Sequence, residues 1–260
     1  MKKFLICIAF LSMMGGKCFS QFSPNHMTPD YLKGYMLGAQ EGKWIEAFPY
    51  LKTEADKGNE AAQYQVALCY ERGEGVDANF QEAFSYMYKA ASGNIPCEQA
   101  YTHLGLYYRD GMGCSQNYNE AIKWFRKGAE SSSIKETKTS CTFHMGIMYL
   151  EGWGVQQDYA QSVYWFRKAA EQGHAVAAHN LGNRYIFGEG VMENETEAVK
   201  WWRKAAELDY APAQYNMGLV YLKGTGNTPI NKSIALQWFK KAAALGMTDA
   251  LIEIAELEGK

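Results

Sequence analysis

The chain has 260 residues, of which 47% are hydrophobic and 21% charged, and its formal net charge is −2 at pH 7. This balance excludes a mainly disordered chain. The slightly negative charge excludes the basic surface that nucleic-acid-binding proteins use. The length suits one large globular domain or two ordinary ones, provided that the chain contains no internal repeats.

Residues 1–20 have the features of a cleaved secretory signal peptide. Two lysines begin the chain, an apolar run follows, and Cys18 and Ser20 are small residues at the spacing that signal peptidase recognises. The run is shorter than the roughly 20 apolar residues of a membrane-spanning helix. Cleavage between Ser20 and Gln21 is therefore predicted. The alternatives are an uncleaved anchor, an N-terminal core helix, or a lipid attached to Cys18.

Cleavage would change the charge of the chain. It removes three lysines and no acidic residue, which leaves 23 basic and 28 acidic residues and a net charge of −5. That sign argues against nucleic acids and anionic lipids as partners. No later stretch is long and apolar enough to span a bilayer, so an exported protein, periplasmic or secreted and without a transmembrane segment, is predicted.

A short linker, residues 21–28, precedes an irregular first helical hairpin over residues 29–58. In that hairpin Gly42 is predicted to form the turn, and Ala47 stands three residues before an aromatic residue, as in the repeats that follow. Terminal units of repeat proteins are expected to depart from the common pattern in this way.

Five repeats are predicted over residues 59–246. The tripeptide Gly-x-Gly recurs at intervals of 38, 41, 36 and 36 residues, and a tyrosine stands three residues before each copy. A small residue and, three positions later, an aromatic residue follow each copy. The first glycines of the five copies are Gly73, Gly111, Gly152, Gly188 and Gly224.

Each repeat is predicted to be a helix–turn–helix hairpin. Apolar residues three and four apart mark two amphipathic helices, and the glycines between them allow a turn with positive φ. A small residue in the first helix lets the second helix approach closely, and the tryptophans of the second helices are expected to fill the space between hairpins. Such hairpins bury their faces only by stacking on one another.

Two further segments depart from the period. Residues 131–140 are a polar insertion, expected as a loop, and account for the interval of 41 residues. Residues 247–260 are predicted to form a final capping helix, with Glu253, Glu256 and Glu258 facing solvent.

The pattern resembles the Sel1-like repeat (SLR) family, a relative of the tetratricopeptide repeat. The resemblance covers most of the chain after residue 59 and implies an all-α fold, a right-handed α/α superhelix (solenoid) of helix–turn–helix repeats. Within residues 178–206 the positions that match the family's spacing are Ala178, Leu181, Gly182, Tyr185, Gly188, Gly190, Val191, Ala198, Trp201, Ala205 and Ala206.

Two columns of side chains recur on the first helices. The polar column is Gln65, His103, His144, Asn180 and Asn216. It is predicted to face the concave side of the array, either in solvent with a hydrogen bond to the neighbouring helix or as a groove that binds an extended peptide. The aromatic column is Tyr64, Thr102, Phe143, His179 and Tyr215. It suits a peptide or glycan surface and suits packing between helices equally well. A zinc ion shared by His103 and His144 is disfavoured, because no third ligand is evident.

Four cysteines remain after residue 20, namely Cys69, Cys97, Cys114 and Cys141. An even number behind a signal peptide permits disulfides, and pairs 97–141 and 69–114 are conceivable. Secreted relatives in this family carry one disulfide in each repeat, but the cysteines of this chain fall at different repeat positions. Buried free thiols are the competing interpretation.

The leading functional hypothesis is a non-enzymatic scaffold without cofactor or metal, which binds a protein, a peptide or a component of the cell envelope through the groove. The alternative, implied by secreted relatives, is a penicillin-binding or β-lactamase-like hydrolase. The sequence Ser132-Ser-Ile-Lys135 matches the Ser-x-x-Lys motif of such enzymes, but their other two motifs do not follow it. No catalytic residue is assigned.

Overall fold

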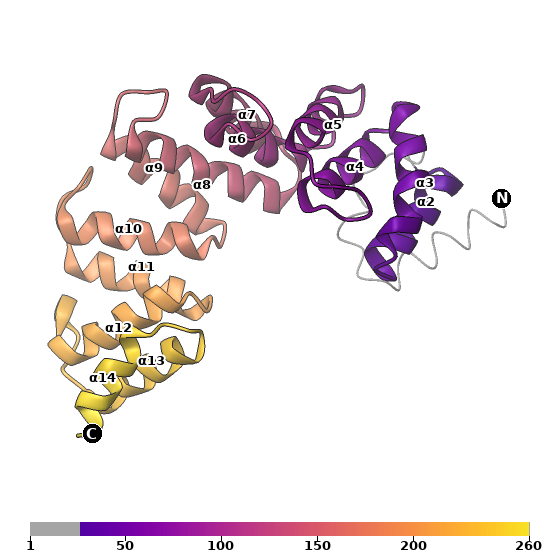
Figure 1. Cartoon of the computed structure of the whole chain (residues 1–260). Helices are drawn as coiled ribbons and strands as arrows, with labels where there is room; N and C mark the ends of the chain where they lie inside the picture. The colour runs from indigo at the N-terminus through magenta and orange to yellow at the C-terminus, as the bar shows by residue number, and fades with distance from the viewer. Residues whose placement is uncertain (1–26, 260) are drawn as a thin grey trace. The chain divides into compact units, whose positions relative to one another are not determined.

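The computed structural model describes residues 27–259. Within that range the chain is built of helices, as the repeats predict (Figure 1). The predicted signal peptide and Cys18 lie outside the described residues. The helices are α2 (Pro29–Tyr35), the π-helical η2 (Met36–Gln40), α3 (Trp44–Asp56), α4 (Glu60–Arg72), α5 (Phe80–Ser92), α6 (Ala100–Asp110), α7 (Tyr118–Ser131), α8 (Lys135–Glu151), α9 (Tyr159–Glu171), α10 (Ala175–Phe187), α11 (Glu195–Glu207), α12 (Ala211–Lys223), the 3₁₀-helical η3 (Thr225–Asn227), α13 (Lys232–Ala244) and α14 (Asp249–Glu258).

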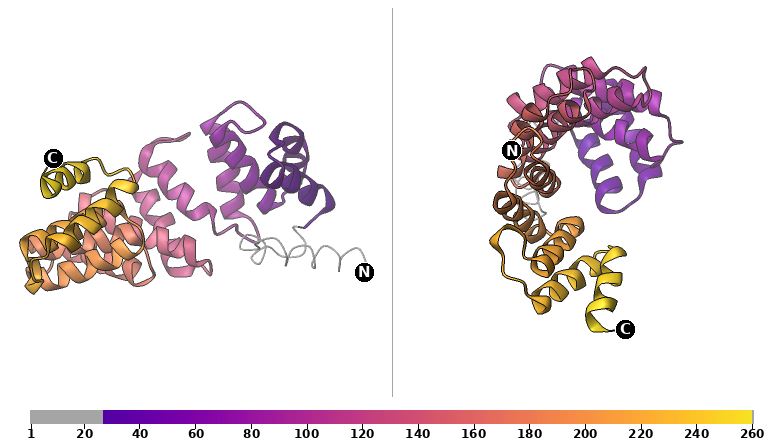
Figure 2. Two further views of the ribbon diagram at one scale, coloured as in Figure 1. Left: turned by 90° about the horizontal axis from the view of Figure 1, so that it is seen from below. Right: turned by 90° about the vertical axis from the view of Figure 1, so that its left-hand side faces the viewer.

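The helices follow one another as hairpins, so that α4, α6, α8, α10 and α12 are first helices and α5, α7, α9, α11 and α13 are second helices. Neighbouring hairpins lie side by side within one unit, as α8–α9, α10–α11 and α12–α13 show (Figure 2). None of the described helices is long and apolar enough to cross a membrane.

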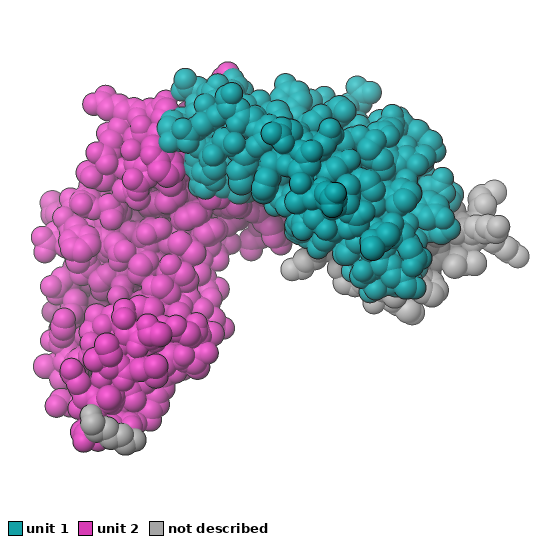
Figure 3. All heavy atoms as spheres, in the orientation of Figure 1, with its two compact units in different colours: residues 1–121 teal, residues 122–260 magenta. Residues whose placement is uncertain are grey.

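The chain divides into two compact units, residues 1–121 and residues 122–260 (Figure 3). The boundary falls inside α7. Unit 1 therefore contains α2 to α6, and unit 2 contains α8 to α14.

Both ends of the inter-helix turns are specified by the sequence. The first glycine of each Gly-x-Gly ends a first helix in the left-handed region, with φ of 65° at Gly188 and 80° at Gly224, which confirms the predicted turn with positive φ. An asparagine or aspartate then begins the second helix. For example, the side chain of Asn194 accepts a hydrogen bond from Glu197 N at 3.0 Å, an N-cap that stabilises a helix by about 1 kcal/mol.

The second glycine of the pair makes a contact that the sequence does not reveal. A Cβ atom added to Gly190 would lie within 3.0 Å of the backbone carbonyl of Tyr159, at the start of the second helix of the previous hairpin. Gly113 meets the carbonyl of Phe80 in the same way. The second glycine therefore lets two hairpins touch backbone to backbone.

In α8, α10 and α12 the small residue of the first helix behaves as predicted. A Cβ atom on Gly146, Gly182 or Gly218 would lie within 3.0 Å of the ring of Phe166, Trp202 or Phe239, on the second helix of the same hairpin. These rings belong to the residue that follows the recurrent tryptophan, so that residue makes the close approach within each of these hairpins. Trp201 is itself buried, and Nζ of Lys204 lies 5.0 Å from its ring centroid.

The recurrent tyrosine before each turn also has a partner in the previous hairpin. Arg167 of α9 donates a hydrogen bond to the hydroxyl of Tyr185 in α10 at 2.6 Å. Arg203 of α11 donates to the hydroxyl of Tyr221 in α12 at 3.3 Å. These tyrosines therefore join successive hairpins.

The insertion at residues 131–140 is not the loop that its polar composition suggests. Helix α7 continues to Ser131 and α8 begins at Lys135, so α8 has 17 residues where α10 and α12 have 13. The inserted threonines are buried, and Thr139 donates a hydrogen bond to the side-chain oxygen of Gln172 at 2.8 Å. The insertion extends the helix because its polar side chains find partners there.

The final helix α14 is less polar outside than predicted. Glu256 and Glu258 are exposed, but Glu253 is half-buried. Glu258 pairs with Lys240 at 2.8 Å. The side chains that α14 presents to solvent include Leu251 and Ile252, which are 57% and 62% exposed.

Candidate interaction face of the first helices

The structure places both columns on the first helices, one pair of neighbouring positions in each repeat. Gln65 and Tyr64 are buried. The other members of the two columns are half-buried, so parts of their side chains reach solvent. They are His103, His144, Asn180, Asn216, Thr102, Phe143, His179 and Tyr215.

In unit 1 the columns meet around Glu71. The hydroxyl of Tyr64 lies 3.5 Å from Nε2 of His103. Nδ1 of His103 lies 3.3 Å from Oε2 of Glu71, and the hydroxyl of Tyr107 donates a hydrogen bond to the same oxygen. These four side chains connect α4 to α6 through polar atoms.

Glu71 is the carboxylate of this cluster. The hydrogen bond from His103 lowers the pKa of Glu71 despite partial burial, and the bond from Tyr107 adds to this effect. Burial raises the pKa of Tyr107, and its bond to Glu71 raises it further. The cluster is therefore an ionised carboxylate held by two donors at neutral pH.

In unit 2 the columns begin with stacked rings. His144 stacks on Phe125, with ring centroids 4.8 Å apart, and Phe143 stacks on His174, with centroids 4.4 Å apart. Phe143 also packs against the core of the following hairpins. The aromatic column thus contributes to packing between helices here.

A hydrogen bond joins the two columns between α10 and α12. The amide Nδ2 of Asn216 lies 3.2 Å from Nε2 of His179, and His179 makes an edge contact with Tyr210 at 5.2 Å between centroids. Burial lowers the pKa of His179 to about 4. His179 is therefore neutral at pH 7, and its Nε2 accepts a hydrogen bond from the amide of Asn216.

A hydrogen bond of the same kind joins α12 to α14. The hydroxyl of Tyr215 donates to Oε1 of Glu253 at 3.2 Å. Glu253 stands 37 residues after Asn216 and therefore continues the polar column. In three places, then, an aromatic-column residue contacts the polar-column residue of the next repeat. The sequence pattern did not predict Glu253 as a member, although one more period of the repeat leads to it.

Beside the columns of unit 2 lies a small cavity of about 170 Å³. Asn216 contributes a polar wall and Lys223, which is exposed, a charged one. The remaining lining residues are mostly apolar, namely Ile186, Trp202, Leu219, Val220 and Thr225. An apolar pocket with a few polar groups at its edge is typical of sites that hold a side chain of a partner.

The four cysteines of the described chain are free thiols in the structure, and three of them are buried. Burial raises the pKa of Cys69 to about 12, and it also raises the pKa of Cys114. Buried thiols of this kind pack as small apolar side chains, and the pairing of the cysteines stays a prediction.

The Ser-x-x-Lys sequence does not form a nucleophilic site. Ser132 is buried between α7 and α8, and its Oγ accepts a hydrogen bond from Ile134 N at 3.1 Å. Lys135 is the first residue of α8, so the pair does not lie one turn apart on a helix as the hydrolase motif requires. No group of three or more potential metal ligands occurs among residues 27–259.

Comparison with known proteins agrees with this architecture. The Sel1 repeat model matches residues 60–95, 98–133, 139–174, 175–210 and 211–247. The crystal structure of a Sel1 repeat protein from Oxalobacter formigenes is 32% identical, with a TM-score of 0.74, over 88% of this chain and 87% of that chain. Among curated proteins, none is significantly similar to this chain.

A second similar structure is c5321, a protective antigen present in uropathogenic Escherichia coli strains that displays an SLR fold. It is 28% identical, with a TM-score of 0.75, over 89% of this chain and 48% of that chain, so this chain spans about half of its length. The repeat matches, the helical hairpins and the solved structures agree, and the chain belongs to the Sel1 repeat family.

Proposed function

We propose that this protein is an exported, non-enzymatic scaffold that binds a protein or peptide through the face of its first helices, the concave groove that the sequence predicts. The observation that carries the proposal is the chain of contacts between the two columns. Polar and aromatic side chains are held in fixed positions there, yet remain half exposed. A rigid polar surface lowers the ordering cost of binding.

The groups on this face suit an extended peptide. Asn180 and Asn216 offer amide donors and acceptors for a peptide backbone. The cavity beside Asn216 has room for one apolar side chain, and Lys223 at its edge favours an acidic neighbour. A peptide with an apolar residue next to an acidic one is therefore the preferred ligand of unit 2.

Binding is tested with an array of synthetic peptides probed with the purified chain. A peptide that binds should lose at least tenfold in affinity when Asn216 is replaced by Ala, since an unpaired backbone group costs about 1–3 kcal/mol. Gln237, an exposed amide on the second helix α13, provides the matched control. Equal losses for Asn216→Ala and Gln237→Ala would rule out this face as the binding site.

Export is proposed from the features of residues 1–20 and is tested separately. The full chain is expressed in a bacterium, and the mass of the protein recovered from the periplasm is measured. A mature protein that begins at Gln21 supports export. An uncleaved chain found only in the cytoplasm contradicts export without affecting the binding proposal.

A further inference from the structure

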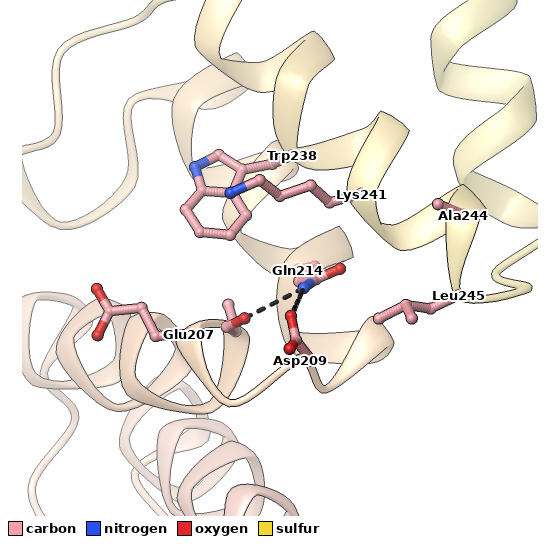
Figure 4. A pocket seen from close by; sticks show the side chains of 8 residues that line it. Glu207, Asp209, Gln214, Trp238, Lys241, Ala244 and Leu245 are labelled. Carbon is pink, nitrogen blue, oxygen red and sulfur yellow. Dashed lines mark hydrogen bonds between the residues drawn. The ribbon is translucent and has the colours of Figure 1, made fainter.

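Unit 2 contains a second, larger cavity that none of the column residues lines. It has a volume of about 450 Å³ and lies between the end of α11, the start of α12 and the helix α13. This volume is within the range of about 300–1,000 Å³ that is common for small-molecule sites. It is lined by Ala206, Glu207, Asp209, Gln214, Trp238, Lys241, Ala244 and Leu245 (Figure 4).

One wall carries an acidic residue at a position where glycine is expected. Three other hairpins of the chain have a glycine with positive φ at this point, namely Gly58, Gly173 and Gly246. Here Asp209 adopts the left-handed conformation, with φ of 56°. A residue with a side chain pays a conformational cost there, and such costs concentrate at functional sites.

The floor of the cavity is Gln214, which is 2% exposed. Its Nε2 donates to the carbonyl of Ala206 at 3.2 Å and to Oδ1 of Asp209 at 3.3 Å. Both bonds go to acceptors, so the orientation of the amide is fixed. Its carbonyl oxygen Oε1 has no hydrogen-bond partner among the described residues. A buried acceptor without a donor indicates that a donor belongs nearby.

The first repeat provides a comparison within the same chain. Gln63 occupies the equivalent position and donates to the carbonyl of Ala55 at 3.1 Å, also with an unpartnered Oε1. There the neighbouring residue is Gly58 rather than an aspartate. The bond from glutamine to carbonyl is thus a repeated structural feature, and the carboxylate of Asp209 is what distinguishes the cavity in unit 2.

The two walls carry opposite charges (Figure 4). Glu207 and Asp209 lie at the C-terminal end of α11, where the helix dipole adds negative potential. On the other side Nζ of Lys241 lies 4.4 Å from the ring centroid of Trp238 and forms no ion pair with a described residue. Leu245 and the indole of Trp238 supply apolar surface in the same cavity.

We propose that this cavity binds a free α-amino acid with an apolar side chain. The ammonium group of the ligand pairs with Asp209, and its carboxylate pairs with Lys241. Its side chain packs against Trp238 and Leu245. A zwitterion satisfies both charged walls at once, whereas a simple cation or anion satisfies one wall and is repelled by the other. This site is independent of the face of the first helices.

The test is titration of the purified full chain with L-leucine, followed by the indole ¹H–¹⁵N signal of Trp238, which the Trp238→Phe variant identifies. A saturable shift with a Kd at or below about 1 mM is expected. Two analogues test the zwitterion requirement. They are 3-methylbutylamine, which lacks the carboxylate, and 4-methylpentanoate, which lacks the ammonium group. Each should bind at least tenfold more weakly than L-leucine.

Variants with a matched control complete the test. Asp209→Gly restores the residue found at Gly58, Gly173 and Gly246, so it should fold at least as stably as the parent and bind L-leucine at least tenfold more weakly. Lys241→Gln should weaken binding similarly. Lys204→Gln, at the same repeat position in α11 but outside the cavity, should leave binding unchanged.

Several results would overturn the proposal. They are no saturable shift with L-leucine, equal binding of either analogue, or full binding to Asp209→Gly. The unfolding temperature of each variant is measured in parallel, and a loss of binding by a variant that unfolds at the parent's temperature supports the proposal.

Discussion

The side-chain amide of Asn216 donates a hydrogen bond to Nε2 of His179 in the preceding repeat, with 3.2 Å between the two nitrogens. This one bond joins the polar column of one hairpin to the aromatic column of its neighbour. Tyr215 and Glu253 repeat the relation one hairpin later. The columns are therefore both structural and exposed, so that residues available to a partner also hold the hairpins together.

The burial of His179 predicts a pH dependence of stability. Because burial lowers the folded-state pKa of His179 to about 4, below the ordinary 6.5, the unfolded chain binds the proton more tightly. The contribution of neutral His179 to the stability of the fold is complete above about pH 6.5 and is lost as the pH falls toward 4. Between pH 7 and pH 5 the loss is at most about 2 kcal/mol.

This dependence is measured by urea unfolding of the parent and of His179→Gln at pH 7 and pH 5. The glutamine cannot titrate, so the variant should lose less stability on acidification than the parent. Equal losses in the two proteins would show that His179 is not the group responsible.

The second glycine of the turn predicts a large difference between two similar substitutions. Gly190 and Gly173 both have positive φ, at 74° and 98°. A Cβ atom on Gly190 would collide with the backbone of Tyr159, whereas nothing lies within 4 Å of one on Gly173. Gly173→Ala should lower the free energy of unfolding by about 1–2 kcal/mol from backbone strain alone. Gly190→Ala should lower it by on the order of 3–4 kcal/mol.

Urea unfolding of the two variants measures that difference. Because both carry the same strain from the positive φ, the excess isolates the contact between hairpins. If Gly190→Ala proved no more destabilising than Gly173→Ala, the backbone contact with Tyr159 would have no energetic importance.

The free thiols predict slow reaction with a thiol reagent. Cys69, Cys97 and Cys141 are buried, and Cys114 is partly buried. Burial raises the pKa of Cys69 to about 12, so little thiolate forms at pH 8. The chain without residues 1–20 should therefore react at no more than one thiol when folded and at four when unfolded. Fewer than four reactive thiols in the unfolded, unreduced protein would reveal a disulfide.

The sequence predicted the fold because its signals are local and periodic. Each first glycine is a helix end with positive φ, and Gly146, Gly182 and Gly218 of the first helices each lie against a ring. What it could not resolve is which of two adjacent residues makes a contact. Trp201 and Trp202 differ by about 100° around the helix, and only packing shows that Trp202 meets Gly182.

Other features depend on contacts between residues far apart in the sequence, which the sequence pattern does not predict. The insertion at residues 131–140 is polar enough for a loop, yet Thr139 finds Gln172 and the segment becomes helical. Gln65 shares its column with half-exposed residues but is itself buried. The cavity around Gln214 joins three helices, so the sequence shows only that Asp209 replaces a glycine.

Backbone amide chemical-shift mapping with a bound peptide shows whether the face of the first helices binds the partner. The largest shifts are expected at His179, Asn180, Asn216, Leu219 and Lys223. Shifts confined to exposed residues of the second helices, such as Gln237, with the first helices unchanged, would contradict binding at this face.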